Sequence, residues 1–480
     1  MLQKKKTNSL KYVMMLITTK TDNERGVYLH GYYSTRSTVL STGSKILVLF
    51  LKPWKSKKSY GIIDWVMKMK SFNYEEMFAQ SIGLQEPWRV ERVEYDEEKR
   101  EVHIYVKARK TSKYPCPECG KMCTRYDDEE EERIWRHGDV CFFPCYVHCR
   151  RPRIKCGNKY HVVTAPWARK GSRYTLLFES YAMLLMRSMP VEHARKLLRV
   201  SHTAMRRILK YWVEKAVEND DLSEVSAICI DETSFKRGQS YVTVISDAIA
   251  RRVIDVEDGR DSKTVEKFSY KLEEKGGKCE NIHTFVSDMS AAFIGGKELC
   301  FPNARMIIDK FHVKQLMLNA MDEVRRAEQG KAVSNKRNAG KKLLMIPEER
   351  QNEQQREAVA LLSKKYPKTG RAFRMVQGLD EMYRCNHPSE AEKIFNRLTS
   401  WLKRSRLEPM KKVADTLRKH KKSILGYFFA RVTNAVAEGI NSIIQSAKRR
   451  ARGYRTLESY KCMIYLVAGK FSLDCPPLFA

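Results

Sequence analysis

Hydrophobic and polar positions change their spacing several times along the chain, and each change marks a boundary between predicted elements. From residue 88 the sequence WRVERVEYDEEKREVHIYVKAR alternates apolar and polar residues on both sides of an Asp-Glu-Glu turn, which predicts a β-hairpin. Short alternating stretches continue beyond it, so we expect a β-rich module over residues 69–170. Residues 1–68 show no sustained period and are assigned no fold.

A helical spacing replaces the alternation over residues 171–222. Pro190 stands near the start of a short amphipathic helix, and the pattern breaks at residues 199–201 before a second helix begins at His202. This spacing is typical of a helix-turn-helix, although paired short helices also occur in other helical domains. DNA binding is favoured by the exposed basic residues of the second helix, where phosphate and base contacts are usually made: Arg206, Arg207 and Lys210.

Strand spacing returns over residues 223–315 and predicts an α/β core. Three consecutive strands are followed by a helix, and then by two units in which a strand runs into a helix. Residues 316–428 are charged and helical, so we expect a helical block there. Its breaks are expected near Pro347, Pro367, Pro388 and Pro409.

The C-terminal segment, residues 429–480, contains an amphipathic helix with one carboxylate on its polar face. At 100° per residue, an apolar face is formed by Val436, Ile440, Ile443 and Ala447. The opposite face carries Asn434, Glu438, Asn441, Gln445, Lys448 and Arg452. Such a helix is commonly a solvated surface helix. The polar face is followed by a basic run expected to hold a DNA backbone: Lys448, Arg449, Arg450 and Arg452.

Two aspartates give the polar face another interpretation. Asp231 closes the first core strand and Asp288 closes the fourth. Each alone could be a turn residue or a helix N-cap. In a ribonuclease H-like sheet these strands are neighbours, so both carboxylates would meet at one edge, and a returning helix could aim Glu438 at them. Three converging carboxylates require a cation, and two divalent ions would support in-line displacement at a phosphodiester.

The cysteines are clustered, with seven of the 13 between Cys116 and Cys156. Cys116 and Cys119 have the two-residue spacing that lets both thiolates bind one tetrahedral ion, which predicts a structural zinc site. We expect Cys156 and His161 to complete it. Competing candidates are Cys123, Cys141, Cys145, His148 and Cys149. The alternative is a set of buried cysteines without metal.

Composition narrows the class of protein. The 480 residues are 42% hydrophobic, enough for several cores, and 90 Lys and Arg against 57 Asp and Glu give a formal charge of +33. A polyanion is the expected partner, although charge alone does not separate DNA, RNA and an anionic membrane. The longest apolar run near the start, residues 46–51, is far shorter than the ~20 residues of a membrane span. No secretory signal is evident, and we expect a cytoplasmic protein that does not bind membranes.

Several motifs together resemble a known family. The segments CPECG, WRHGDV, PWARKGSRYT, IDETSFKRGQSYVTVISD, VSDMSAAF, DKFHV and TNAVAEGINSIIQSAKRRARGY resemble, in this order, DDE-type transposases of insertion sequences, specifically the ISL3 group. The resemblance runs from about Glu86 to the end of the chain. It implies a multidomain α+β fold: a small zinc-binding β module, a helix-turn-helix, and a ribonuclease H-like α/β core interrupted by an all-helical insertion.

The resemblance also implies roles for individual residues. Asp231, Asp288 and Glu438 would form the catalytic triad and bind Mg²⁺ or Mn²⁺. Residues expected to lie beside these carboxylates and hold them in place are Asp309, His312, Asn434 and Asn441. The family usually has a more closely spaced second zinc pair than Cys156 and His161. Residues 1–68 have no counterpart in it, and one hypothesis is that translation begins at Met67, Met69 or Met77.

The sequence thus predicts the transposase of a bacterial or archaeal insertion sequence, located with the nucleoid. It would bind the terminal inverted repeats of its element, cleave to expose 3′-hydroxyls and join them to target DNA, acting as a homo-oligomer on DNA. Two alternatives stay open. One is a domesticated, non-catalytic DNA-binding regulator, and the other is a ribonuclease H-like nuclease whose products are cut but not joined.

Overall fold

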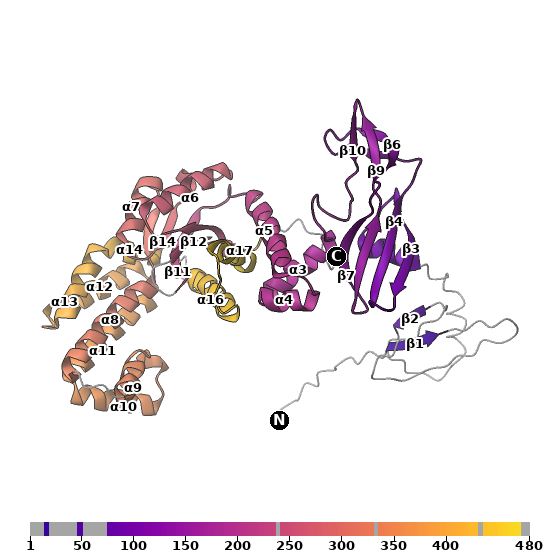
Figure 1. Cartoon of the computed structure of the whole chain (residues 1–480). Coiled ribbons are helices and arrows are strands. Elements are labelled where there is room, and N and C mark those ends of the chain that lie inside the picture. Colours follow the sequence, from indigo (N-terminus) through magenta and orange to yellow (C-terminus); the bar gives the residue numbers. More distant parts are fainter. Residues whose placement is uncertain are drawn as a thin grey trace, which may run out of the picture. The chain divides into compact units, whose positions relative to one another are not determined.

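The computed structural model shows a chain of mixed α-helix and β-sheet, as predicted (Figure 1). It describes residues 14–18, 46–50, 74–236, 241–330, 335–430 and 435–471. The chain divides into two compact units. Unit 1 comprises residues 1–136 and 140–173, and unit 2 comprises residues 137–139 and 174–480. Among the described helices, none combines the length and the apolar character needed to cross a bilayer.

Unit 1 is built mainly from strands. Its sheets have the orders β3-β4-β8-β7, β10-β9-β6-β5 and β1-β2. The hairpin predicted from the alternating sequence is β3 and β4, and β4 pairs in parallel with β8. The elements are β1 (Met14–Thr18), β2 (Ile46–Phe50), α2 (Tyr74–Ile82), β3 (Trp88–Asp96), β4 (Glu101–Ala108), β5 (Lys113–Pro115), β6 (Met122–Asp128), β7 (Arg133–Val140), β8 (Phe143–Cys149), β9 (Pro152–Cys156) and β10 (Lys159–Val162).

One apolar core serves the two larger sheets of unit 1. Every second residue of β4 is buried, as the period-two pattern requires. Trp167 packs edge-on against Trp88, with ring centroids 5.0 Å apart, and against Trp135 at 5.5 Å. Tyr114 of β5 belongs to the same cluster, so the sheet that carries the cysteine pair rests on the core of the larger sheet.

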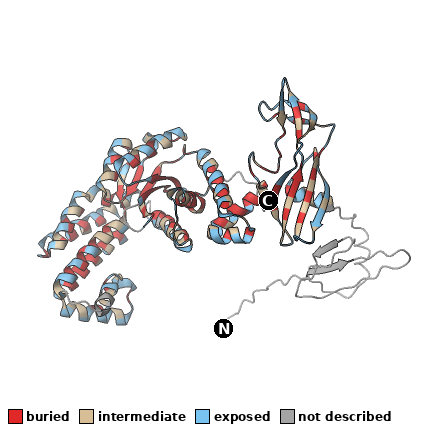
Figure 2. Ribbon diagram, in the orientation of Figure 1, coloured by how far each residue is buried: buried red, intermediate tan, exposed pale blue. Residues whose placement is uncertain are grey.

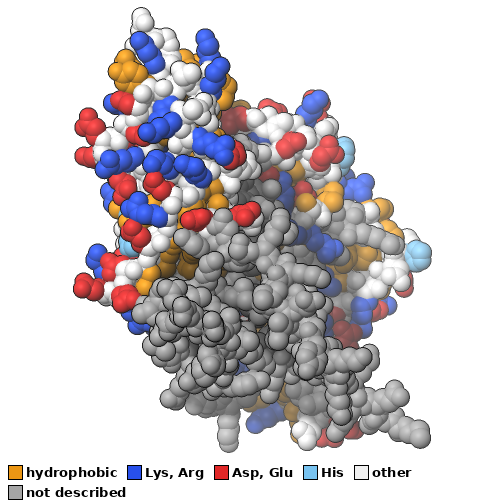
Figure 3. Space-filling model, turned by 90° about the vertical axis from the view of Figure 1, so that its right-hand side faces the viewer, with side chains coloured by type: hydrophobic (Ala, Val, Ile, Leu, Met, Phe, Trp, Pro, Cys, Tyr) orange, Lys and Arg blue, Asp and Glu red, His pale blue; other side chains and the backbone are white. Residues whose placement is uncertain are grey.

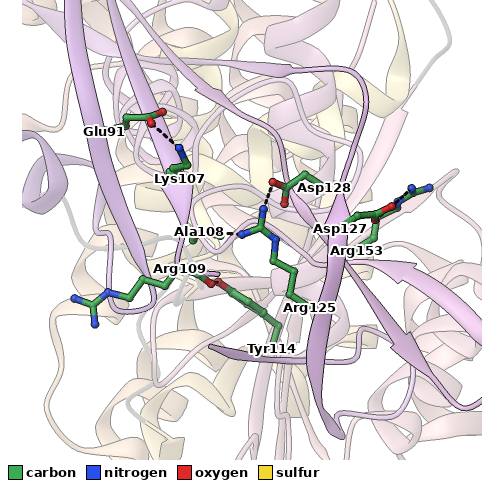
Figure 4. Close-up of polar contacts among 9 residues, drawn as sticks. All are labelled: Glu91, Lys107, Ala108, Arg109, Tyr114, Arg125, Asp127, Asp128 and Arg153. Carbon is green, nitrogen blue, oxygen red and sulfur yellow. Dashed lines mark hydrogen bonds and ion pairs between the residues drawn. The ribbon is translucent and has the colours of Figure 1, made fainter. Parts of the chain in front are cut away.

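Ion pairs and hydrogen bonds add to this core (Figure 4). Arg125 of β6 pairs with Asp128 and donates a 3.5 Å hydrogen bond to the carbonyl of Ala108 at the end of β4. Arg153 of β9 donates to Asp127 of β6 at 2.6 Å. These contacts join the small sheet both to β4 and across its own strands.

Unit 2 begins with the predicted helix-turn-helix, formed by α4 (Val191–Leu198) and α5 (His202–Glu218) after α3 (Leu176–Ser188). Ser201 caps α5 by accepting a 3.1 Å hydrogen bond from the Ala204 amide. Arg199 occupies the turn in the left-handed conformation, with φ 55°. Glycine is favoured there, and this explains why the turn is a weak sequence signal.

The core of unit 2 is a five-stranded sheet of order β13-β12-β11-β14-β15. Strand β11 pairs in parallel with β14, so the first and fourth strands are neighbours, as expected for a ribonuclease H-like core. Figure 2 shows the sheet strands mostly buried. The elements are β11 (Ala227–Ser234), β12 (Tyr241–Asp247), β13 (Arg252–Asp258), α6 (Ser262–Glu274), a 3₁₀ turn at Cys279–Asn281, β14 (Thr284–Ser287), α7 (Ala291–Cys300) and β15 (Arg305–Ile308).

A helical block follows β15, as predicted, and has its own apolar core. Pro367 and Pro388 stand in the first turns of their helices, where the missing amide hydrogen costs nothing. The helices are α8 (Lys310–Gln329), α9 (Asn335–Leu344), α10 (Glu353–Lys365), α11 (Pro367–Arg384), α12 (Pro388–Arg404), α13 (Glu408–Lys419), α14 (Lys421–Leu425) and α15 (Tyr427–Ala430), with a 3₁₀ turn at Glu348–Arg350. The chain then returns to the sheet through α16 (Ala435–Arg450) and α17 (Leu457–Ala468).

Candidate functional site

Three parallel neighbouring strands bring aspartates to one side of the sheet. Asp231 does not close its strand as expected, because β11 continues to Ser234, whereas Asp288 and Asp309 directly follow β14 and β15. Period-two alternation puts Asp231 on the same face as Cys229, Asp288 on that of Val286, and Asp309 on that of Ile307. The three apolar residues form one buried cluster with Ala437 of α16. Helix α16 therefore covers the face on which the aspartates lie.

Asp231 is held by groups from three elements. The side chain of Asn441 in α16 donates to its Oδ2, and the amide of Glu232 donates to its Oδ1 at 2.7 Å. His312 Nε2 of α8 lies 3.7 Å from Oδ1. The side chain is 23% exposed, so this carboxylate is fixed in orientation and still reachable from solvent.

Asp288 follows β14 at the start of the turn into α7. Its Oδ1 accepts a 2.9 Å hydrogen bond from the amide of Ser290. Burial and then the charge of Asp288 raise the pKa of Glu232. The charge of Asp288 also contributes to the raised pKa of His312, so Asp288 lies in the same local field as Asp231.

Asp309 and His312 lie at the start of α8. Asp309 caps this helix by accepting a 2.5 Å hydrogen bond from the amide of Phe311. Burial raises the pKa of Asp309 to about 6, and the charges of Asp231 and Glu438 add to the increase, while His312 opposes it. His312 Nε2 lies 3.7 Å from Asp309 Oδ2, and the pKa of His312 is raised chiefly by the neighbouring Asp231 carboxylate.

Glu438 is exposed in the first turn of α16. Its charge acts on Asp309, but its oxygens do not form, with those of the aspartates, a group within 4.8 Å of one another in the described part of the chain. Among described residues, no lysine or arginine nitrogen lies within 4.0 Å of Asp231, Asp288 or Glu438. The carboxylates therefore share one region without a cationic side chain between them.

The polar face of α16 runs along β11 rather than into solvent. Beyond Asn441, Gln445 donates to Thr233 Oγ1 at 2.7 Å, and the Lys448 ammonium donates to the carbonyl and, at 3.1 Å, to Oγ of Ser234. On the apolar side Ile444 is buried and Ile443 is 47% exposed, so the expectation for Ile443 is wrong. The polar side of the helix is half-buried against β11, and its buried apolar arc is therefore rotated toward Ile444.

The remaining predicted DNA-binding residues are placed as follows. Arg206 donates to Thr456 Oγ1 at 3.1 Å, and Lys210 pairs with Glu458; these two partner residues lie at the start of α17. Arg450 donates to the carbonyl of Ser188 at 2.8 Å. Exposed side chains are those of Arg207, Arg449 and Arg452. Asn434 lies outside the described residues.

The cysteine cluster brings together three of its four predicted ligands. The sulfurs of Cys116, Cys119 and Cys156 all lie within 4.8 Å of one another, and Cys119 Sγ is 3.6 Å from Cys156 Sγ. Gly120, at φ 72°, closes the turn by donating to the Cys116 carbonyl at 2.9 Å. Backbone amides of Cys119 and Glu118 lower the pKa of the Cys116 thiol, which favours the thiolate that binds metal.

His161 is not part of this group. Its Nδ1 lies 3.7 Å from Glu118 Oε1. Of the competing cysteines, Cys123 lies in the same sheet, and the thiols of Cys119, Cys123 and Cys116 raise the pKa of Cys156 to about 12. The other competitors lie in or beside β8 of the larger sheet: Cys141, Cys145, His148 and Cys149.

Comparisons with known proteins agree with this division of the chain. A zinc-finger model of the transposases IS204, IS1001, IS1096 and IS1165 matches residues 112–158. A model of the helix-turn-helix domain of transposase family ISL3 matches residues 163–213. The DDE domain model of the same family, described as transposase, matches residues 228–464. The chain belongs to the ISL3 family of transposases.

Two relatives of this ISL3 family chain extend the likeness over most of its length. The transposase for insertion sequence element IS1001 of Bordetella parapertussis is 24% identical over 398 residues, which cover 80% of this chain and 96% of that protein. The transposase for insertion sequence element IS1557 of Mycobacterium tuberculosis is 23% identical over 413 residues, covering 79% and 92%. Both sequence similarities extend over the zinc ribbon, the helix-turn-helix and the core.

Some residues of the ISL3 site were not anticipated from sequence. Thr233 and Ser234 receive the side chains of Gln445 and Lys448, so they fix α16 against β11. Their only signal is position, directly after Asp231 and Glu232 on the same strand. Thr456 likewise contacts Arg206 across 250 residues of sequence, which no local pattern reveals.

Proposed function

We propose that this ISL3 family member cleaves DNA at the terminal inverted repeats of its element and transfers the exposed 3′-hydroxyls to target DNA. Asp231, Asp288 and Glu438 would bind Mg²⁺ or Mn²⁺ for both steps. The observation that carries the proposal is that Asp231 lies on β11 and Asp288 directly follows the adjacent parallel strand β14, under the helix that bears Glu438.

The donor set fits a hard divalent cation. Carboxylate oxygens are the ligands that Mg²⁺ prefers, and it commonly binds through one or two of them together with substrate phosphate. Among described side chains, His312 is the one group able to carry a positive charge that lies within 4.0 Å of Asp231 and Asp309. A cation would relieve the repulsion among the three carboxylates.

The protein side chains supply orientation. Asn441 and the Glu232 amide both donate hydrogen bonds to Asp231 and so fix the orientation of its carboxylate. Asp309 caps the start of α8 and thereby keeps His312 beside Asp231. When bound, divalent cations activate the attacking oxygen and stabilise the leaving oxygen. Water and then the 3′-hydroxyl are the nucleophiles, so no covalent protein–DNA intermediate is implied.

The other parts of the chain would deliver DNA to this site. The helix-turn-helix would read the inverted repeat through α5, with Arg207 on its exposed side. The zinc ribbon would bind one structural Zn²⁺ through Cys116, Cys119 and Cys156. Because two element ends must be joined, we propose a homo-oligomer on DNA.

The test is an in vitro reaction with Mg²⁺, purified protein and a labelled duplex copied from the DNA that borders the gene. Wild type should produce cleaved and strand-joined products, and Asp231→Asn should produce neither. The control is Asp258→Asn, another aspartate at a strand end of the same sheet, which pairs with Lys461. Cleavage without joining would instead indicate a nuclease, and binding without cleavage a regulator.

A further inference from the structure

A groove of about 560 Å³ lies between the helix-turn-helix and the turn that joins α16 to α17. Its walls come from α3, α4 and α5 on one side and from residues 447–467 on the other, all within unit 2. Apolar side chains such as Met186, Leu209 and Met463 form part of the lining. The groove thus combines the predicted DNA-reading helix with the end of the helix that carries Glu438.

Three guanidinium groups in this groove have no carboxylate bound to them among the described residues. Arg206 and Arg450 bond to neutral oxygens, those of Thr456 and Ser188, and each bond leaves further N–H donors available. Arg455 is exposed. A fourth arginine, Arg195, is neutralised by a two-pronged bond to Glu192 at 2.7 and 2.6 Å.

The turn between α16 and α17 directs Arg455 into the groove. Two consecutive residues, Arg452 and Gly453, have φ values of 55° and 92°, which reverse the chain sharply after α16. Thr456 then caps α17 by accepting a 3.3 Å hydrogen bond from the Ser459 amide. Arg455 follows these constraints in sequence and lines the groove on the wall opposite the helix-turn-helix.

We propose that this groove binds the phosphodiester backbone of the element end, between the base pairs read by α5 and the phosphodiester that is cleaved. An anionic backbone would supply the negatively charged partner that Arg206, Arg450 and Arg455 do not have among the described residues. Arginine binds phosphate oxygens with paired N–H donors. The naming of DNA as the occupant rests on the proposed function.

For a duplex that runs along α16, the length of this helix sets where on the DNA the contact falls. Glu438 and Arg450 are twelve residues apart on this helix, which is ~18 Å at ~1.5 Å per residue. That span equals about five base pairs at ~3.4 Å each. The groove should therefore hold phosphates about three to seven base pairs from the cleaved bond.

Fluorescence anisotropy tests the groove with full-length protein and a labelled duplex copied from the DNA bordering the gene, in buffer without divalent cations. Arg450→Gln and Arg455→Gln should each weaken binding about tenfold at 0.1 M salt and lower the slope of log K against log salt by about 1. The control is Arg397→Gln on α12, an exposed arginine paired with Glu381, which should match wild type.

Neutral methylphosphonates, placed one at a time along the duplex, locate the phosphates that the groove binds. Those about three to seven base pairs from the cleaved bond should weaken wild type, and at the phosphate that Arg455 contacts the substitution should have no added effect on the Arg455→Gln variant. Equal losses in both proteins at every one of those positions, or an Arg455→Gln variant that binds like Arg397→Gln, would overturn the groove. Because the assay reads binding alone, a catalytic failure of the proposed carboxylates would leave its outcome unchanged.

Discussion

The two candidate metal sites differ in how far they are assembled without metal. In the zinc ribbon, three cysteine sulfurs already lie within 4.8 Å of one another, placed by a tight turn and by the β6 and β9 strands. In the core, Asp231 is fixed on β11 and Asp288 directly after β14, but Glu438 is exposed and its oxygens do not join theirs in such a group among the described residues.

Charge explains the difference. Neutral thiols can pack against one another at little cost, whereas carboxylates brought together without a cation repel each other. Burial is the main cause of the raised pKa of Asp309, about 6, and the charges of Asp231 and Glu438 add a smaller contribution of this repulsive kind. A structural site is therefore formed by folding, while a catalytic site of this kind keeps its last ligand accessible for metal and DNA.

The largest expected effect comes from Glu438→Gln. It keeps the size of the side chain but removes the charge that would hold a divalent ion, so cleavage of a labelled element end should fall by at least about 10³-fold. Binding of the same duplex, measured by anisotropy, should not change. The assay is an in vitro cleavage reaction with Mg²⁺.

Glu408→Gln is the matched control, because Glu408 is also an exposed glutamate in the first turn of a helix. Among the described residues Glu408 pairs only with Lys411 of its own helix, at 2.6 Å, whereas Glu458 is less suitable because it pairs with Lys210 of α5, a predicted DNA-binding residue. If Glu438→Gln cleaves like Glu408→Gln while Asp231→Asn is inactive, the third carboxylate lies elsewhere and Glu438 is a surface residue.

The zinc ribbon should lose its fold when its thiols are removed. Cys116→Ser combined with Cys119→Ser should lower bound zinc from about one to about zero per chain, because structural zinc contributes folding free energy directly. Metal analysis measures the zinc, and amide hydrogen exchange should show lost protection over residues 113–162.

Cys141→Ser is the control, because Cys141 is exposed at the β7–β8 turn. The fourth ligand is found by comparing Cys123→Ser with His161→Asn, and the variant that loses zinc identifies it. A wild-type protein purified without zinc would contradict the structural role altogether.

The sequence predicted the strand-helix order of the core because its apolar spacing is local. The ends of β11 and β14, and therefore the neighbourhood of Asp231 and Asp288, followed from that order and from the resemblance. The rotation of α16 could not be predicted, because burial of its polar side depends on Thr233 and Ser234 from another part of the chain. Ile443 was misplaced for that reason.

The stability of unit 1 should depend on pH, whereas the carboxylate site should depend on metal. Burial and the neighbouring His148 lower the pKa of His103, whose Nδ1 lies 2.9 Å from His148 Nε2. The unfolded chain then binds this proton more readily than the folded one, so stability falls as pH drops through about 6.5. His103→Gln should lose less Tm than wild type between pH 7.5 and 5.5 in thermal melts. His283→Gln, at an exposed position, should behave like wild type.

The smallest expected effect separates stability from DNA binding on α16. Burial lowers the pKa of Lys448, whose ammonium bonds Ser234, so its loss should act on the helix rather than on a phosphate. Lys448→Gln should lower Tm by about 2 °C, from a hydrogen bond worth ~1 kcal/mol, and leave the salt slope of DNA binding unchanged. Arg449→Gln, exposed one residue later, should do the reverse by lowering the slope by about 1. If Lys448→Gln changes the slope and not Tm, its ammonium turns to the DNA backbone in the complex, as the sequence alone predicted.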